Sequence, residues 1–422
     1  MARQENSNKS TRDLILNAAF SFYEKPFFLD FSMSQVAQKV GISKAAIYRH
    51  FKNKEELVQQ MSDSFFDLFA EKIVSIQKAK KMREQPVFRN QFKAVVVFFA
   101  ENTQYINYFI NRHTQIRDYE DVIVRELVAR GVRPDSDEFF TQIKMDSTLK
   151  RYSHIYYCAV TFLLYIKLRE KNLALSGNEG LSVEDFADRM IDFLHNGIVG
   201  TIGETPYFTK ISEERFAELD KICEICADDM PEENRIFTAF AEVIKKYGMN
   251  GVTVERIAGE LGMAKSSLYF YFENKNKMLF SLVSKEISFL KTACAENSVD
   301  AKSYTEFIYI NMRTEISYFA LRPSILAICG WLLQTTDDEL VEKDNKECNE
   351  SNNVWENRVK DDLKKIDLGF PILPNHFTFI TGILPVALTF FIRKHKLSLE
   401  QSLESLRYLF DFAMYGVNLE HF

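Results

Sequence analysis

The chain has few cysteines, few glycines and prolines, and no excess of basic charge. Its 422 residues contain 6 Cys, 15 Gly and 9 Pro, a composition that excludes a secreted disulfide scaffold, a collagen-like repeat and a low-complexity chain. The formal net charge is −6, which argues against a general binder of polyanions. Any contact with nucleic acid must therefore come from local basic patches.

Long hydrophobic runs are also missing. The longest apolar stretches, residues 155–168 and 377–392, are shorter than the roughly 18 to 20 residues that a bilayer span needs. The segment from Met1 to Ser10 is polar and has no apolar signal sequence. We therefore expect two buried helices at these stretches, no membrane contact and a cytoplasmic protein.

An internal repeat organises the chain. Residues 15–57 align without a gap onto residues 236–278, and 10 of the 43 positions are identical. Each of the following identical residues has its match 221 positions later: Ile15, Ala18, Lys25, Ala37, Gly41, Lys44, Tyr48, Phe51, Asn53 and Lys54. The two segments are expected to form the same structural unit.

In each copy, apolar residues recur at helical spacing in two successive segments. These are residues 15–22 and 33–40 in the first copy, and residues 236–243 and 254–261 in the second. Spacings of i, i+3, i+4 and i+7 place the apolar side chains on one helical face. Each copy therefore begins with two short amphipathic helices.

Capping residues and glycines mark the ends of the second helix. Ser32 and Thr253 precede it as candidate N-caps. Gly41 and Gly262 follow it and permit the left-handed conformation that ends a helix. A third short helix then begins after a tight turn. This is the pattern of the helix-turn-helix, whose second helix enters a DNA major groove.

Both copies resemble the N-terminal DNA-binding domain of TetR-family transcriptional regulators. The resemblance rests on the strings SMSQVAQKVGISKAAIYRHFKNKEELV and TVERIAGELGMAKSSLYFYFENKNKML. Its most specific features, present twice, are the Tyr-x-x-Phe that ends the recognition helix and the Asn-Lys that opens the next helix. It covers roughly a hundred residues, and the remainder matches the family only in length and helical character.

We therefore predict an all-α protein made of two tandem repeats. Each repeat is expected to have an N-terminal three-helix helix-turn-helix DNA-binding domain followed by a helical ligand-sensing and dimerisation domain. The expected divisions are residues 10–57 (the first head), 58–205 (the first sensor domain), 206–231 (a linker helix), 232–278 (the second head) and 279–422 (the second sensor domain).

The predicted DNA contacts lie on the exposed faces of the two recognition helices and at the helix starts beside them. Lys and Arg can bind guanine or phosphate, Ala can touch a thymine methyl, and Ser and Tyr can bind phosphate. In the first head the predicted contacts are Ser32, Ser43, Lys44, Ala45, Tyr48, Arg49, His50 and Lys54. In the second they are Thr253, Ala264, Lys265, Ser266, Tyr269, Phe270, Tyr271 and Lys275. The alternative is a solvated helix face that binds nothing.

The second head is less basic and more aromatic than the first, with Glu273 where the first has Lys52. We therefore expect the two heads to prefer different half-sites. The resemblance to the family implies that Lys54 and Lys275 bind phosphate at the start of the following helix.

Each repeat is about the size of a whole family member, so the simplest interpretation is a fused pseudo-dimer that can be monomeric in solution. Linkage replaces bimolecular assembly with an effective concentration on the order of millimolar. By resemblance, residues 182–199 and 398–417, with the apolar helices before them, are candidates for a four-helix interface. The alternative is that they form the cores of two independent domains.

Two polar segments lie outside the heads, one between the repeats and one within the second sensor domain. Residues 212–229 show the pattern of a charged amphipathic helix, and Met230 and Pro231 end it. Residues 335–365 are rich in Asp, Glu and Asn, which is typical of a surface insertion that is partly mobile.

A hydrophobic small-molecule effector is implied by the resemblance. Aromatic residues make up 14% of the chain, including 37 Phe, and an apolar pocket between the sensor helices can bind such a ligand. Any single aromatic residue has the alternative of being core. The ligand-binding residues are unknown, and His113, Arg117, His154 and Arg313 are only candidate polar anchors.

No motif indicates a cofactor, a metal or an enzyme. Cys223 and Cys226 lack a second ligand pair for zinc and are expected on one face of a helix. No phosphate loop or catalytic motif is present. The sequence predicts a ligand-responsive repressor that binds an imperfectly palindromic operator in double-stranded DNA. The alternative is a helical small-molecule-binding or interaction protein with only one working head.

Overall fold

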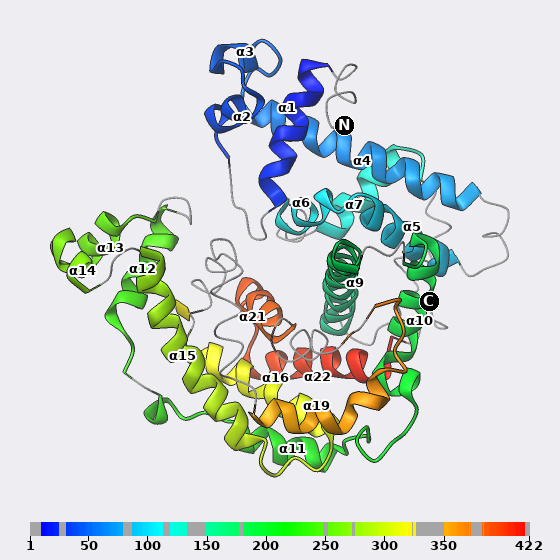
Figure 1. The fold of residues 1–422 in the computed structure, drawn as a ribbon, viewed down its shortest axis with the longest axis vertical. Coiled ribbons are helices and arrows are strands. Elements are labelled where there is room, and N and C mark those ends of the chain that lie inside the picture. Colours follow the sequence, from blue (N-terminus) through cyan, green and yellow to red (C-terminus); the bar gives the residue numbers. More distant parts are fainter. Residues whose placement is uncertain are drawn as a thin grey trace. The chain divides into compact units, whose positions relative to one another are not determined.

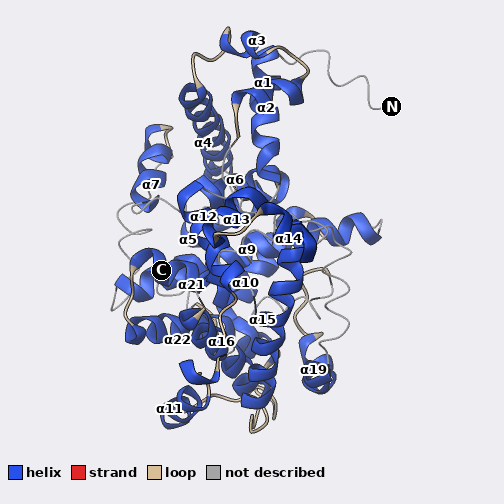
Figure 2. Cartoon of the chain, turned by 90° about the vertical axis from the view of Figure 1, so that its left-hand side faces the viewer, coloured by secondary structure: helices blue, strands red, loops and turns tan. Residues whose placement is uncertain are grey.

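The computed structural model describes residues 10–24, 31–78, 87–112, 119–132, 148–176, 180–230, 232–247, 252–271, 275–322, 324–325, 350–370, 372, 382 and 384–417. Helices and connecting loops make up this part of the chain (Figure 2). Its only β-type pairing is an isolated bridge between Thr205 and Phe208. The predicted all-α class is confirmed.

The α-helices labelled in Figure 1 are α1 (Thr11–Phe20), α2 (Met33–Val40), α3 (Lys44–Tyr48), α4 (Lys54–Lys78), α5 (Val87–Glu101), α6 (Gln104–Arg112), α7 (Tyr119–Ala129), α9 (Thr148–Ser176), α10 (Val183–Ile202), α11 (Glu213–Ile222), α12 (Arg235–Tyr247), α13 (Val254–Leu261), α14 (Lys265–Tyr271), α15 (Lys275–Asn297), α16 (Tyr304–Leu321), α19 (Glu350–Leu363), α21 (Leu384–His395) and α22 (Leu399–Tyr415). Two short 3₁₀ helices are η1 (Ser21–Glu24) and η3 (Ala227–Asp229).

The chain divides into two compact units, residues 1–142 and 143–422. The sequence analysis instead assigned residues 58–205 to one domain. The difference arises from α9 and α10, which pack on α22 of the second half. Their apolar faces are therefore buried against a helix more than two hundred residues further along the chain.

The core of the first unit is a dense group of aromatic rings. Phe65 of α4 lies 5.8 Å from Phe98 of α5 and 5.7 Å from Tyr105 of α6, measured between ring centroids. Most of these pairs are edge-to-face or tilted, and each such pair is worth about 0.5 to 1.5 kcal/mol beyond the area it buries. The aromatic residues at 98–99 and 105–109 whose side chains are described are buried in this core.

In the second unit, α22 is packed between several helices. It contacts α9, α10, α16 and α21 (Figure 1). Ser182 and Ser398 cap α10 and α22: Ser182 Oγ accepts from the Asp185 amide at 3.0 Å, and Ser398 Oγ accepts from the Gln401 amide at 3.2 Å. The buried face of α10 includes Met190 and Leu194, and that of α22 includes Leu409.

Two glycines bring the backbone of α10 into close contact with the end of α22. Gly197 and Gly416 both have positive φ, +65° and +80°. A Cβ on Gly197 would lie 2.7 Å from the Tyr415 carbonyl carbon, and one on Gly416 would lie 2.6 Å from that of Asn196. The Val417 amide donates to the Leu194 carbonyl oxygen at 2.9 Å beside this crossing. Only glycine fits either position.

The linker between the repeats is docked on the second unit. Arg215 of α11 binds both carboxylate oxygens of Glu306 of α16, at 3.1 and 2.8 Å, and the Glu306 side chain is only 9% exposed. Phe216 packs edge-on against Tyr309 at 4.7 Å. Removing one partner of so buried an ion pair costs about 3 to 5 kcal/mol, so α11 is held firmly.

Two details of the linker differ from the sequence prediction. The helix ends at Ile222 instead of continuing to Asp229, and only the short η3 follows. Cys223 and Cys226 therefore do not share a helical face. Cys223 is buried with its Sγ 3.6 Å from the Ile310 carbonyl oxygen, and Cys226 is exposed.

The polar segment at 335–365 is not wholly a surface insertion. Residues 326–349 lie outside the described part, but α19 begins at Glu350 and buries Trp355 and Val359. The indole of Trp355 stacks on Phe307 at 5.7 Å. A few apolar residues at helical spacing dock this helix although most of its residues are polar.

None of the described helices is long and apolar enough to cross a membrane. The apolar stretch at 155–168 lies within α9, where Leu163 and Ile166 are buried. Of the stretch at 377–392, the part from Leu384 onward belongs to α21.

Candidate DNA-binding site

Local signals build the helix-turn-helix of the first head. Ser32 Oγ accepts from the Gln35 amide at 3.2 Å, and the Gln35 side chain accepts from the Ser32 amide at 2.8 Å, which completes a capping box at the start of α2. Gly41 ends α2 with φ +78°. Ser43 Oγ then accepts from the Ala46 amide at 3.1 Å and caps α3. The predicted turn and the Ser32 cap are confirmed, and the Ser43 cap is an addition from the structure.

The recognition helix α3 has one buried edge. Ile47 is buried, and so is Phe51, three residues past the end of the helix. Lys44, Ala45 and Arg49 are exposed. The predicted contacts Ser43 and Tyr48 are exposed as well, Tyr48 at 44%, while His50 is half-buried. The structure thus leaves the reading face of α3 open to solvent.

A residue that the sequence analysis missed supports this helix. Arg12 of α1 donates to the His50 carbonyl oxygen at 2.8 Å, and its guanidinium lies 4.4 Å from the centre of the Phe51 ring. It therefore fixes the end of the recognition segment to α1. No motif marks Arg12, because its partners are 38 and 39 positions away.

Basic residues also stand at the start of α4. Lys54 is its first residue, and the Lys54 Nζ lies 5.4 Å from the centre of the Phe31 ring. Asn53 caps the helix by accepting from the Glu56 amide at 2.8 Å. Positive side chains at a helix start beside a recognition helix are suited to a phosphate.

The second head repeats the architecture. Thr253 Oγ1 accepts from the Arg256 amide at 3.2 Å at the start of α13. Gly262 ends α13 with φ +66°. Leu268 of α14 is buried, as its counterpart Ile47 is in the first head. Ala264, Lys265 and Ser266 are exposed at the start of α14.

Part of the second reading face is not described. Tyr269, Phe270 and Tyr271 lie on α14 and Lys275 is the first residue of α15, but their side chains lie outside the described part of the structure. Their roles in DNA binding stay predictions.

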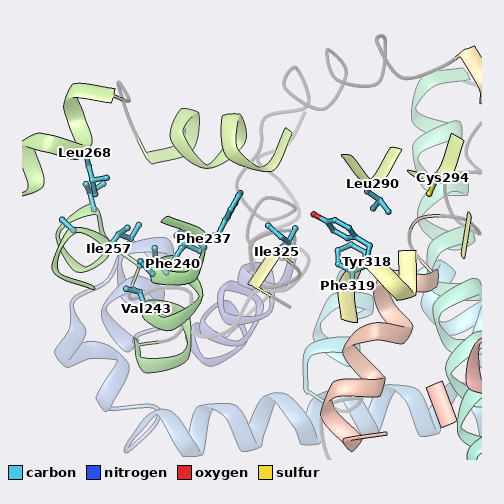
Figure 3. Close-up of a cluster of buried hydrophobic side chains, with 14 residues drawn as sticks. Phe237, Phe240, Val243, Ile257, Leu268, Leu290, Cys294, Tyr318, Phe319 and Ile325 are labelled. Carbon is cyan, nitrogen blue, oxygen red and sulfur yellow. The ribbon is translucent and has the colours of Figure 1, made fainter. Parts of the chain in front are cut away.

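The second head shares its core with the sensor helices that follow. One buried cluster runs from Phe240 and Leu268 in the head to Leu290 of α15 and Tyr318 of α16 (Figure 3). Tyr318 also donates to the Glu286 carboxylate of α15 at 2.6 Å. Because packed interiors resist small displacements, a shift of α16 is expected to be felt in the head.

The first head is joined to its neighbours in a similar way. Phe20 at the end of α1 packs edge-on against Tyr105 of α6 at 4.8 Å, and Tyr23 of η1 against Tyr108 at 5.2 Å. Both heads are therefore continuous with the helical domain that follows them.

The candidate effector anchors have structural roles where they are described. His154 is buried against Phe412 at 5.3 Å, and burial lowers the pKa of its imidazole to about 4, so the ring is neutral. Arg313 is buried 3.4 Å from Asp220 of the linker helix. His113 and Arg117 lie outside the described residues. A shallow hollow on the first unit has a mixed lining that includes Leu68, Lys72 and Phe98.

The described residues offer no metal site, since no three His, Cys, Asp or Glu side chains gather within reach of one ion there. The described residues instead form two helix-turn-helix units with capped helices and exposed recognition-helix residues. These define a double-headed helix-turn-helix protein.

Comparison with known families agrees with this class. The family model described as "Bacterial regulatory proteins, tetR family" matches residues 15–61 and again residues 236–282. The chain thus carries two TetR-type DNA-binding domains in tandem, and the resemblance to this family of DNA-binding transcription regulators is confirmed. No curated protein shows significant similarity to the sequence.

Proposed function

We propose that the chain is a single-chain, ligand-responsive repressor whose two heads bind one imperfectly palindromic operator. The observation that carries this proposal is the presence of two helix-turn-helix units, each with its buried edge packed and its basic or hydroxyl-bearing residues exposed. A chain with two such units can bind both half-sites without a second subunit.

The packing of α9, α10, α21 and α22 supports the pseudo-dimer. In a two-chain regulator of this kind, the last two helices of each subunit form a four-helix interface. Here α10, which closes the first repeat, packs on α22, which closes the second. Each helix has a Phe-x-x-x-Gly segment at this contact, Phe193 to Gly197 within α10 and Phe412 to Gly416 at the end of α22, and the two glycines meet.

The pseudo-symmetric crossing favours a fused dimer over two independent domains. Independent domains would each bury their own closing helix, whereas α10 and α22 bury theirs against each other. Covalent linkage then keeps the two heads on one molecule at any dilution. It also frees them from being identical.

The ligand response rests on the continuity between heads and sensor helices. A ligand can change operator affinity only if it prefers one arrangement of the heads. Couplings of about 1 to 3 kcal/mol would change that affinity severalfold to a hundredfold. The shared core of the second head, α15 and α16 provides a physical connection for such coupling.

DNA selection with the full chain, followed by light scattering of the complex, tests the proposal. We expect an imperfect palindrome with half-site centres about one helical turn, ~34 to 36 Å, apart, bound by one chain. A complex of two chains with four heads, or a perfectly palindromic site, would contradict the pseudo-dimer. If no hydrophobic compound changes the electrophoretic mobility of the protein–operator complex, that result would argue against the ligand response.

The runner-up is a protein with one working head. It is favoured by the lower basic charge of the second recognition region. Neutralising Lys265 and Lys275 should flatten the salt dependence of operator affinity by about one unit each if both heads bind. An unchanged slope would instead support the single-head alternative.

A further inference from the structure

The aligned recognition regions of the two heads carry different charge. Residues 31–54 contain five bases, Lys39, Lys44, Arg49, Lys52 and Lys54, and no Asp or Glu. Residues 252–275 contain three bases, Arg256, Lys265 and Lys275, and three acids, Glu255, Glu260 and Glu273. The formal charge is therefore +5 in the first region and 0 in the second.

Two of these acids bind lysines of the second head itself. Glu255 in the first turn of α13 forms an ion pair with Lys265, the first residue of the recognition helix. Glu260 at the other end of α13 lies 2.7 Å from Lys246 of α12. Both pairs join neighbouring helices of the helix-turn-helix, so the acids are part of the scaffold that presents the recognition helix.

The Glu255–Lys265 pair lies where DNA is expected. Lys265 is the counterpart of Lys44 and is one of the predicted contacts, and Thr253, two residues before Glu255, is another. The Lys265 side chain is 49% exposed and the Glu255 side chain 56%, so the pair is open to a duplex. The hydrogen bond from Lys265 lowers the pKa of Glu255, so this carboxylate is charged at neutral pH.

The first head has no counterpart of this pair. Ser34 occupies the position of Glu255, and it is exposed and uncharged. The Lys44 Nζ lies 6.0 Å from the centre of the Tyr48 ring, and no acid occurs among residues 31–54. The charge of Lys44 is therefore available to DNA in a way that the charge of Lys265 is not.

We propose that Glu255 is an intramolecular substitute for a DNA phosphate and that it lowers the affinity of the second head for DNA. In the DNA-free protein the carboxylate occupies Lys265, and DNA binding requires the lysine to exchange it for a phosphate. After that exchange the carboxylate remains beside a polyanion, which weakens the contact. The first head binds first and anchors the chain, and the second head docks only where its half-site compensates for the repulsion. This inference rests on the proposed function.

The exchange is physically accessible because exposed ion pairs contribute little to stability and are screened by salt. Glu255 therefore lowers the affinity of the second head for DNA but does not prevent it from binding. Removing the Glu255 carboxylate should raise the net positive charge beside the duplex by one, which steepens the slope of log affinity against log salt by about 0.9.

The matched swap Glu255→Ser and Ser34→Glu tests the proposal in the full chain. Operator DNA chosen by selection is titrated by fluorescence anisotropy from about 50 to 200 mM salt. Glu255→Ser should tighten binding roughly threefold to tenfold and steepen the salt slope by about one unit. Ser34→Glu, which places the same acid in the first head, should weaken binding and flatten the slope by a similar amount.

A double variant checks that Glu255 acts through Lys265. The gain from Glu255→Ser should be smaller when it is combined with Lys265→Ala, because no lysine is then released and only the relief of repulsion between the carboxylate and the duplex remains. The isosteric Glu255→Gln should reproduce most of the gain of Glu255→Ser. Unchanged urea midpoints of all variants establish that the comparison is made between folded proteins.

Two results would overturn the proposal. Weaker binding by Glu255→Ser, with lost preference at one base pair, would mean that the carboxylate reads a base such as cytosine. Unchanged affinity and slope, in a chain whose Arg49→Ala variant does lose affinity, would mean that Glu255 does not restrain DNA binding. Failure of the proposed function looks different, because the wild-type chain would then select no DNA and neither Ser34→Glu nor Arg49→Ala would have an effect.

Discussion

In the first head, Ser43 caps the recognition helix, and Lys44 and Arg49 are exposed to solvent. In the second head, the recognition helix starts after Ala264, and its first residue, Lys265, forms an ion pair with Glu255. The backbones of the two units follow the same signals: a capped second helix, a left-handed glycine and a recognition helix with one buried apolar edge. The comparison teaches that the scaffold of a helix-turn-helix and its surface charge are specified by different residues. A fused chain can therefore keep the scaffold in both copies and alter the charge in one.

The turn glycines sharpen the comparison of scaffolds. Gly41 and Gly262 have positive φ and nothing within 4 Å of an added Cβ, so alanine at either should cost a similar amount, about 1 to 2 kcal/mol. Alanine at Gly197 or Gly416 should cost more, about 3 kcal/mol or above, because the new methyl group would also meet the backbone of the other helix. Urea unfolding measures all four.

Equal losses at all four glycines would contradict the close crossing of α10 and α22. A larger loss at Gly41 than at Gly262 would show that the two turns are not equivalent. The head variants serve as controls for the cost of positive φ alone.

The DNA-facing surfaces of the two heads can be compared at one equivalent position, which is Arg49 in the first head and Phe270 in the second. Arg49 and Phe270 are 221 positions apart. Arg49→Ala should weaken operator binding by about 1 to 3 kcal/mol and reduce the salt slope, because a cation at base or phosphate is lost. Phe270→Ala should leave the slope unchanged, since no charge is removed. Anisotropy titrations at several salt concentrations distinguish the two, and a loss of slope with Phe270→Ala would be inconsistent with the assigned roles.

The N-caps give a smaller difference. Ser32 belongs to a reciprocal capping box with Gln35, whereas Thr253 accepts from Arg256. Alanine at either should cost about 1 kcal/mol, with the larger loss at Ser32 because the reciprocal bond to its own amide is disturbed too. Thermal unfolding monitored by circular dichroism provides the measurement. A larger loss at Thr253 would reverse the order.

Lowering the pH should destabilise the second head but not the first, and this is the smallest of the expected effects. The hydrogen bond from Lys265 lowers the pKa of Glu255 below its ordinary 4.5, so the folded second head binds fewer protons than the unfolded chain near that pH. The stability from this pair is present above the unfolded pKa and is lost as the pH falls through the folded pKa. The protection of the α13 amides, relative to their intrinsic exchange rates at each pH, should therefore fall in acid, and Glu255→Gln should abolish this fall.

The matching helix of the first head is the internal control. Ser34 in α2 does not titrate, so exchange in α2 should not show this step. The same acid-dependent fall in protection in both helices would mean that it arises from global unfolding.

Much of the fold was predictable because its signals are local. Ser32, Gly41 and Ser43 act on amides within a few residues of themselves, so their roles could be read from spacing alone. The same holds for Ser182 and Ser398, which start α10 and α22. The packing of those two helices was predicted from family resemblance, and the residues of their crossing were not.

Other features could not be predicted because their partners are distant in sequence. Arg12 contacts His50 and Phe51, Arg215 binds Glu306, and Gly197 meets Gly416. The early end of α11 has the same origin, since Cys223 is buried against α16 instead of continuing the helix. The spacing of apolar residues shows which face of a helix is buried, but it does not show which other helix that face packs against.

By itself the sequence determined that two similar helix-turn-helix units exist and which edge of each recognition helix is buried, because caps, turn glycines and apolar periodicity act over single helical turns. Only the tertiary structure decided that α10 closes against α22, that the linker helix is docked by Arg215, and that Lys265 is bound by Glu255. These pairings depend on which surfaces are brought together when apolar faces are buried, and that burial is a property of the whole unit.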